Sequence, residues 1–319
     1  MKKYAISAVI ASVFTLSAPY AAQAYPVTVK SCDREVTFDQ APKRAVSHDI
    51  NITEMMLALE LQDHMVGYTG ISGWNKITPG LQGRLGDIPQ LAEKYPSKEV
   101  LLGADADFYF AGWNYGMKVG GDVTPETLAP FGINVYELGE SCIHIMTKPH
   151  VSMEDMFADL LNLGTIFDVR DRAEKLVAGY RAELADITAH TAKTGQDLRV
   201  FVYDSDEERP FTAARYAMPT AMIEAAGGKN IVDDVESSWT RVGWETVIER
   251  NPEIIVIVNY GTITADQKIA YLKSNPAFAN IDAVRHDRFV VLEYDEATPG
   301  PRNLSAIGKL ARAFYPSAF

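Results

Sequence analysis

The chain has 319 residues and a formal net charge of −12, with 42 acidic and 30 basic side chains. This length fits two domains of about 100–200 residues each. The acidic balance argues against nucleic acid and anionic lipid surfaces as partners, because both repel a protein of this charge.

The first residues predict an export signal. Lys2 and Lys3 give a charged start, and residues 5–18 form an apolar stretch. That stretch is shorter than the about 20 residues that span a bilayer. Ala22-Gln23-Ala24 is a cleavage signal, so we expect a signal peptide over residues 1–24 and a periplasmic protein. A retained membrane anchor is the alternative, and the absence of a Cys after the cleavage site argues against a lipoprotein.

The segment before residue 153 alternates short strands with short helices. This alternation predicts a parallel sheet with helices on both faces. We expect a strand hairpin at 27–38, strands at 44–48, 65–68, 108–111 and 135–138, helices at 55–61, 99–102 and 125–130, and a loop rich in Gly and Pro at 69–86.

Cys32 and Cys142 are the two cysteines of the chain. In an oxidising compartment such a pair favours a disulfide, and two buried thiols are the alternative. No CxxC spacing points to a thiolate metal site.

Helical periodicity dominates the middle of the chain. The pattern predicts one helix that ends near Gly164 and a second from about Asp171 to Thr191. A helix of roughly 20 residues is about 30 Å long, enough to cross the back of a small domain. We expect an N-terminal lobe over 25–168, a connecting helix within 169–194 and a C-terminal lobe over 195–319.

After residue 195 the α/β alternation resumes. We expect strands at 198–203, 254–258 and 289–292, and helices at 219–226, 244–250, 265–273 and 303–314, with Gly227 and Gly228 ending the first of these helices.

Two segments of the chain repeat one another. Residues 99–110 align without a gap with residues 245–256, so that Glu99 matches Glu245 and an acidic residue matches eight positions later. The repeat predicts two similar α/β lobes. The expected fold is therefore α/β, with two lobes built on central parallel sheets, one long connecting helix and a ligand cleft between the lobes.

The order and spacing of several short motifs resemble one known family. Those motifs lie at 41–47, 53–54, 66–67, 86–89, 105–107, 128–133, 225–230, 244–253 and 311–319. They are similar to the periplasmic substrate-binding proteins of ABC importers, in the class that carries siderophores, haem and cobalamin. The resemblance covers nearly the whole chain after residue 24. It implies a monomer without a cofactor of its own, which carries a small metal chelate to an inner-membrane permease and performs no catalysis.

In that family, a glutamate on each lobe docks onto permease arginines, and the matching residues are Glu99 and Glu245. A carboxylate on each lobe can register the protein on a two-fold partner through charge-assisted hydrogen bonds. The alternative is a helix-start glutamate, which interacts favourably with the helix dipole by about 0.3–1 kcal/mol.

The ligand is expected at the carboxyl ends of the strands. Trp113 and Tyr115 follow one predicted strand, and Trp239 lies six residues before Glu245; cobalamin binders of the family place a Trp at positions matching Trp113 and Trp239. The further candidates are His48, Tyr68, Trp74, Tyr203, Arg215, Tyr216 and Arg241. Each aromatic residue has core packing as its alternative, and each Arg has pairing with surface acids such as Asp206.

Capture and delivery of an iron–siderophore complex is the first functional hypothesis. Few arginines lie in the expected cleft, which leaves cobalamin, another corrinoid or haem as alternatives. A binder of free zinc or manganese through His48, His144 and His150 is less favoured. An exported enzyme is disfavoured too, because the sequence has no G-x-S-x-G, H-E-x-x-H or Gly-rich phosphate loop.

Overall fold

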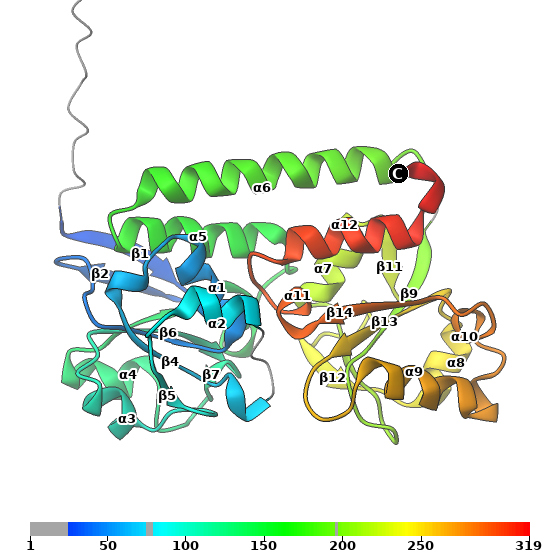
Figure 1. Ribbon diagram of the computed structural model, residues 1–319, viewed down its shortest axis with the longest axis horizontal. Coiled ribbons are helices and arrows are strands. Elements are labelled where there is room, and N and C mark those ends of the chain that lie inside the picture. Colours follow the sequence, from blue (N-terminus) through cyan, green and yellow to red (C-terminus); the bar gives the residue numbers. More distant parts are fainter. Residues whose placement is uncertain (1–24, 75–78, 195–196) are drawn as a thin grey trace, which may run out of the picture.

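The computed structural model describes residues 25–74, 79–194 and 197–319. The predicted signal peptide and its cleavage site lie outside these residues. Two lobes stand side by side beneath the long helix α6 (Arg170–Thr191), which runs across the top of both (Figure 1). The two-lobed α/β fold expected from the sequence is confirmed.

The N-terminal lobe is built on a sheet of parallel strands in the order β5-β4-β3-β6-β7, with β8 also paired to β6. Its strands are β3 (Ala45–His48), β4 (Met65–Thr69), β5 (Gln90–Ala92), β6 (Phe108–Trp113), β7 (Gly116–Met117) and β8 (Asn134–Glu137). Its helices are α1 (Ile50–Ala58), α2 (Pro79–Leu85), α3 (Lys98–Gly103) and α4 (Pro125–Leu128). The predicted hairpin is β1 (Val27–Ser31) with β2 (Arg34–Phe38).

The C-terminal lobe has a parallel sheet in the order β11-β9-β13-β14 and a separate antiparallel ribbon of β10 and β12. Its strands are β9 (Leu198–Tyr203), β10 (Phe211–Ala213), β11 (Gly228–Asn230), β12 (Trp239–Arg241), β13 (Ile254–Asn259) and β14 (Phe289–Glu293). Its helices are α7 (Met218–Ala225), α8 (Trp244–Arg250), α9 (Ala265–Ser274), α10 (Asp282–Arg285), α11 (Tyr294–Ala297) and α12 (Asn303–Phe314).

Three helices cover the top of the two lobes in the view of Figure 1. The long helix α6 packs on α5 (Met153–Ile166) and α12, as Figure 1 shows. Only Ala173, Val177, Ile187 and Thr191 of α6 are buried, so most of its surface faces solvent. This helix lies within the predicted connector 169–194; the domain boundaries themselves stay a prediction. In the part of the chain that the structure describes, no helix is both long and apolar enough to span a membrane.

The two lobes hold the strands β3 and β9 of their parallel sheets with the same contact. In the N-terminal lobe, the Asp107 carboxylate accepts a hydrogen bond from the backbone N–H of Arg44 at 2.9 Å. In the C-terminal lobe, the Glu253 carboxylate accepts one from the backbone N–H of Arg199 at 3.1 Å. The Nε atom of Arg44 donates to the Asp105 carbonyl, just after α3, at 2.8 Å. The Nε atom of Arg199 donates in the same way to the Asn251 carbonyl, just after α8, at 2.9 Å. The sequence repeat therefore corresponds to a structural repeat.

Several elements differ from the sequence-based expectation, among them helices α1 and α2 and the short strands. Helix α1 begins at Ile50 because the side chain of Asp49 caps it, five residues before the predicted start. Helix α2 lies inside the predicted loop, where its glycines hide the helical pattern, although Pro79 is at a favoured first-turn position. The short strands β10, β11 and β12 were not predicted, because strands of three residues are too short to show alternation.

The predicted disulfide between Cys32 and Cys142 is present in the structure. It joins the β1–β2 turn to the 3-10 helix Gly139–His144, across 110 residues of sequence. Both cysteines are buried.

We expect the Cys32→Ala/Cys142→Ala variant to lose about 2–5 kcal/mol of unfolding free energy, because the unfolded chain regains the entropy of an open loop. Urea unfolding followed by circular dichroism measures this loss. Wild-type protein unfolded in a reductant should behave like the variant. An unchanged midpoint would show that the disulfide adds no net stability.

Candidate ligand-binding cleft

A cavity of about 380 Å³ lies where the two lobes face each other. From the N-terminal lobe it is lined by Asp49, Trp74, Tyr95, Asn114, Tyr115 and His144. From the C-terminal lobe it is lined by Asp204, Phe211, Ser238, Trp239, Val258, Tyr260, Tyr294, Ala297 and Thr298. Most of these residues follow the carboxyl end of a strand, which is where parallel sheets place their ligands.

Aromatic rings make up much of the cavity wall. Seven Trp, Tyr and Phe side chains line it, three from the N-terminal lobe and four from the other. Trp239 stacks on Phe211 with ring centroids 5.7 Å apart, and Tyr260 meets Tyr294 edge to face at 5.1 Å. Burial raises the pKa of Tyr115 well above its ordinary value, with a hydrogen bond from Trp239 opposing the shift. Such a wall suits a large ligand with extended apolar faces.

Two carboxylates interrupt the aromatic wall. Asp49 follows β3 and Asp204 follows β9, and each residue is 4% exposed. The Tyr294 hydroxyl donates to Oδ2 of Asp49 at 2.8 Å, and the Tyr260 hydroxyl donates to Oδ1 of Asp204 at 2.9 Å. Burial raises the pKa of both tyrosines, so both keep their proton at neutral pH. The bond from Tyr294 to Asp49 also ties the two lobes together at the cavity.

Basic side chains stand beside this wall rather than in it. No Lys or Arg among residues 25–74, 79–194 and 197–319 lines the cavity. Four basic groups lie over aromatic rings of the wall at 4.6 to 5.5 Å from the centroid, a cation–π distance. The pairs are Lys94 over Trp74, Lys118 over Tyr95, Arg241 over Phe211 and Lys268 over Tyr260.

Of the predicted ligand residues, Trp74, Tyr115 and Trp239 line the cavity. Trp113 does not: it is 5% exposed, and its Nε1 donates to Oε1 of the buried Glu137 at 2.9 Å. In a continuous strand, residues two apart lie on the same face. Strand β6 ends at Trp113, however, and Asn114 has a positive φ of 65°, so the chain turns there and Tyr115 reaches the cavity while Trp113 packs inside the lobe.

Three further predicted residues are buried behind the wall. Tyr68 belongs to the core of the N-terminal lobe, and Tyr203 packs edge to face on Trp244 at 5.4 Å. His48 is 1% exposed; its Nδ1 lies 2.8 Å from Oγ1 of Thr69, and its ring supports Tyr95. Of the three, His48 therefore supports a wall residue directly, and the two tyrosines belong to the cores of their lobes.

The predicted polar candidates of the C-terminal lobe also lie outside the wall. Nε of Arg215 donates to the Asp233 carbonyl at 2.8 Å, and its Nη1 pairs with a surface glutamate. Nε of Arg241 pairs with Asp206 at 3.2 Å. This surface ion pair was the alternative to ligand binding for Arg241. Tyr216 is half-buried and is not part of the lining.

Sequence reasoning missed most of the lining, including all its Asp and Tyr residues except Tyr115. The missed Asp and Tyr residues are Asp49, Tyr95, Asp204, Tyr260 and Tyr294. Four of them directly follow a strand, and that position was the available signal. The sequence-based candidates were mostly aromatic and Arg side chains near strand ends and did not include the first residue after each strand. Tyr95 follows no strand directly and had no comparable signal.

The two predicted docking residues occupy equivalent exposed positions. Glu99 is in the first turn of α3 and Glu245 in the first turn of α8. A hydrogen bond with Ser97 lowers the pKa of Glu99, which keeps it ionised. Both residues belong to the repeated segment, so each lobe presents one carboxylate in the same local setting.

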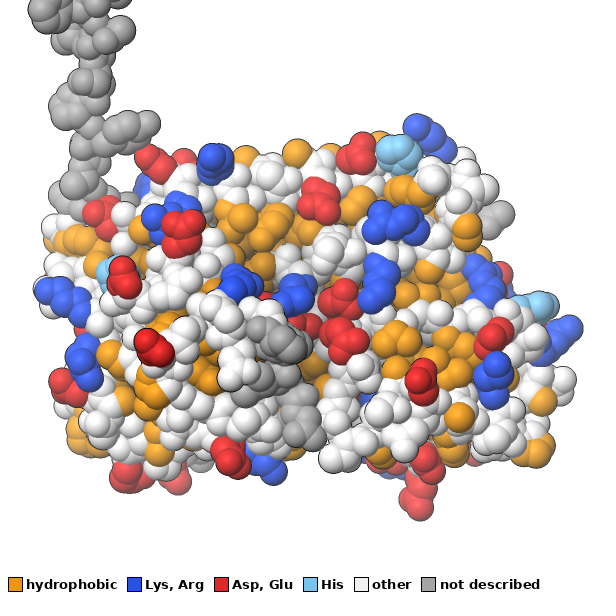
Figure 2. All heavy atoms as spheres, viewed as in Figure 1, with side chains coloured by type: hydrophobic (Ala, Val, Ile, Leu, Met, Phe, Trp, Pro, Cys, Tyr) orange, Lys and Arg blue, Asp and Glu red, His pale blue; other side chains and the backbone are white. Residues whose placement is uncertain are grey.

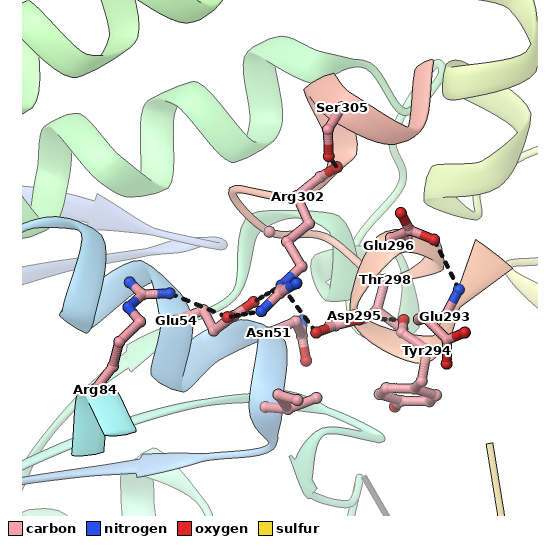
Figure 3. A network of polar contacts seen from close by, with 12 residues as sticks. Asn51, Glu54, Arg84, Glu293, Tyr294, Asp295, Glu296, Thr298, Arg302 and Ser305 are labelled. Atoms are coloured by element: carbon pink, nitrogen blue, oxygen red, sulfur yellow. Dashed lines mark hydrogen bonds and ion pairs between the residues drawn. The ribbon is translucent and has the colours of Figure 1, made fainter. Parts of the chain in front are cut away.

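A network of charged residues joins the two lobes (Figure 3). Glu54 on α1 is 1% exposed and accepts two hydrogen bonds, both 2.8 Å, from Arg302 at the start of α12. Nε of Arg302 also lies 2.9 Å from Oδ2 of the buried Asp295, an ion pair without regular hydrogen-bond geometry. Arg84 on α2 meets Glu54 from the other side at 3.1 Å. Figure 2 shows basic and acidic side chains gathered where the lobes meet on this face.

A buried acid makes another contact between the lobes. Oε1 of Glu140 accepts from the backbone N–H of Met218 at 3.2 Å, and Oε2 has no hydrogen-bond partner among the described residues. Burial raises the pKa of Glu140 to about 8, so this side chain is mostly neutral at pH 7. The part of the chain that the structure describes holds no group of three His, Cys, Asp or Glu side chains placed to bind one metal ion.

A family model described as periplasmic binding protein matches residues 46–295. The chain is 24% identical, over 93% of its length and 88% of the relative's, to an uncharacterized ABC transporter substrate-binding lipoprotein, YvrC, of Bacillus subtilis. It is 23% identical, over 68% of its length and 71% of the relative's, to the vitamin B12-binding protein of Pectobacterium atrosepticum.

Solved structures agree with this assignment. A periplasmic binding protein from Veillonella parvula is 31% identical, with a TM-score of 0.78 over 91% of this chain and 97% of that one. An Fe³⁺-hydroxamate transport protein from Saccharomonospora viridis has a TM-score of 0.76 at 24% identity, covering 91% and 99% of the two chains, and shares the fold. The chain belongs to the periplasmic binding protein family, in the class of substrate-binding proteins of ABC importers.

Proposed function

We propose that this protein captures a corrinoid in the periplasm and delivers it to the inner-membrane permease of an ABC importer. The observation that carries the proposal is the cavity wall, in which seven large aromatic side chains surround the ligand space and no described Lys or Arg takes part. A corrinoid offers broad apolar faces and an edge of neutral amides, which such a wall can cover without basic groups.

The wall changes the order of the hypotheses drawn from the sequence. Anionic ferric catecholates and the carboxylates of haem call for basic partners, because buried charges need pairing. The two predicted cleft arginines, Arg215 and Arg241, instead pair with Glu236 and Asp206. An iron–siderophore complex remains the alternative in its uncharged hydroxamate form, which would meet the same wall without needing a cation.

Delivery to a permease rests on Glu99 and Glu245. Each lies exposed at the start of a short helix, one on each lobe. Carboxylates at matching positions on two lobes suit a partner with two matching basic sites.

Titration with cyanocobalamin tests the proposed ligand. We expect residues 25–319 to bind it with a micromolar or lower dissociation constant and with quenched tryptophan fluorescence, since Trp74 and Trp239 line the cavity. Trp239→Ala should weaken binding at least about tenfold, the scale of one buried aromatic contact. Phe131→Ala removes an exposed aromatic residue that does not line the cavity and is the matched control.

Unchanged fluorescence and melting temperature at saturating cyanocobalamin would contradict the corrinoid proposal. A neutral ferric trihydroxamate is titrated in parallel, and binding of this complex alone would restore the iron–siderophore hypothesis.

A further inference from the structure

The two wall carboxylates occupy equivalent positions in the structural repeat. Arg44 and Arg199 begin the matching strand contacts of the two lobes, and Asp49 and Asp204 each follow five residues later. Each strand therefore delivers a carboxylate to the cavity from its own lobe, and both line the wall.

Both carboxylates are built into the wall. Each is 4% exposed and accepts a tyrosine hydroxyl from the C-terminal lobe. The rings of those two tyrosines are in contact at 5.1 Å, which brings the two acid–tyrosine pairs next to each other. Burial is the main cause of the raised pKa of Tyr260, and the negative charge of Asp49 adds to it.

The hydrogen-bond directions make this part of the wall an acceptor surface. The Tyr260 and Tyr294 hydroxyls donate their protons to the two carboxylates. What these groups can then offer a ligand is oxygen lone pairs, because a phenol has a single proton to donate. A ligand seated here must supply hydrogen-bond donors or positive charge.

The nearby cations do not line the cavity, although the charge of Lys268 offsets part of that of Asp204. Lys268 is buried, lies over the Tyr260 ring at 5.3 Å, and donates to the backbone carbonyls of Asp204 and Val258. Arg241 is paired with Asp206. Both hold parts of the wall in place and neither lines the cavity.

We propose that Asp49 and Asp204 determine the charge specificity of the cleft: they admit neutral or cationic chelates whose periphery donates hydrogen bonds, and they reject anionic ones. This inference rests on the proposed function and adds to it the charge of the ligand and the residues that select it. An anionic ligand group would meet two desolvated carboxylates, and like charges brought together in a buried site oppose binding.

A charge series of one chelate provides the test. The probes are cyanocobalamin, which is neutral; aquacobalamin, which is cationic; and a monocarboxylic acid of cyanocobalamin, in which one peripheral amide has become a carboxylate. We expect the wild-type protein to bind the monocarboxylic acid at least about tenfold more weakly than the two others. A neutral ferric trihydroxamate and an anionic ferric tricatecholate form a second series with the same expected order.

Asp204→Asn and Asp49→Asn should each reduce the ratio between the affinities for cyanocobalamin and for its monocarboxylic acid at least about threefold. The amide removes the negative charge but keeps an oxygen that can accept the hydrogen bond from the tyrosine. Asparagine also caps helices well, so Asp49→Asn preserves the start of α1. Asp186→Asn, on the exposed face of α6, changes the net charge equally and should leave the ratio unchanged.

The outcomes separate the two proposals. If no chelate of either series binds, the proposed function fails, and this inference with it. If chelates bind without regard to charge, or anionic ones bind best, the charge selectivity is overturned while the binding function stands. If both Asn variants melt like the wild type and still bind the neutral chelates over the anionic ones by the wild-type ratio, Asp49 and Asp204 are not the selecting residues.

Discussion

Arg302→Ala is expected to lower the free energy of unfolding by about 2–4 kcal/mol, slightly less than the loss of a partner in a fully buried ion pair, because Arg302 is more than a third exposed. The guanidinium contacts Glu54 from the N-terminal lobe and Asp295 from the C-terminal lobe. Without it, two carboxylates that are 1% and 3% exposed must stay buried beside each other. Urea unfolding at pH 7 measures the loss.

The same variant should show a characteristic pH dependence. Burial already raises the pKa of Asp295 to about 6, although Arg302 opposes the shift. Removing the guanidinium raises this pKa further, so the native state holds a proton that the unfolded chain releases. The stability of the variant should therefore fall as the pH rises from 5 to 8, and its deficit against wild type should be larger at pH 8 than at pH 5.

Arg285→Ala is the matched control. Arg285 pairs with Asp282 three residues away on an exposed surface, and such pairs contribute about 0–1 kcal/mol. Equal losses for Arg285→Ala and Arg302→Ala, or a deficit of Arg302→Ala that does not vary with pH, would contradict a special role for the network between the lobes.

The double variant Glu99→Lys/Glu245→Lys is expected to bind ligand normally and to lose transport. Neither residue lines the cavity, and both are exposed on short helices. If each carboxylate makes a charge-assisted hydrogen bond to the permease, reversing both charges should weaken docking roughly a hundredfold or more. Uptake of labelled cyanocobalamin by cells that carry the cognate importer measures the effect.

The control for docking exchanges two glutamates on the far side of the molecule. Glu174→Lys/Glu183→Lys alters the exposed face of α6 and changes the net charge equally. This control should transport normally. Normal transport by the Glu99/Glu245 variant would refute the docking role, and loss of ligand binding in it would show that the two glutamates act on the cleft instead.

Much of the fold was readable from the sequence because long, periodic elements carry strong signals. Helices 244–250 and 303–314 were predicted to the residue, and the long helix within one residue at its start. Elements of three residues, such as β10 and β12, exist through pairing with a distant partner, which no local pattern reveals. The ribbon they form is what carries Trp239 to the cavity.

The cavity wall was harder to predict than the fold. Trp113 and Tyr115 are two residues apart, and only the loop that follows β6 decides which of them faces the ligand space. Hydrogen bonds between the lobes, such as that from Tyr294 to Asp49 across 245 residues, depend on how the lobes dock. Such contacts form between residues that are far apart in the chain, and a single sequence does not show which distant residues meet.

The matched strand contacts at Asp107 and Glu253 give the two lobes the same local scaffold. In each lobe, a side-chain carboxylate holds the backbone at the start of the strand that ends beside the cavity. Around this shared contact the lobes differ: the N-terminal lobe has a disulfide, and the C-terminal lobe has a ribbon that supplies Phe211 and Trp239 to the cavity wall. Substitutions in either half of the wall can therefore change its ligand contacts while the strand contact of that lobe stays in place.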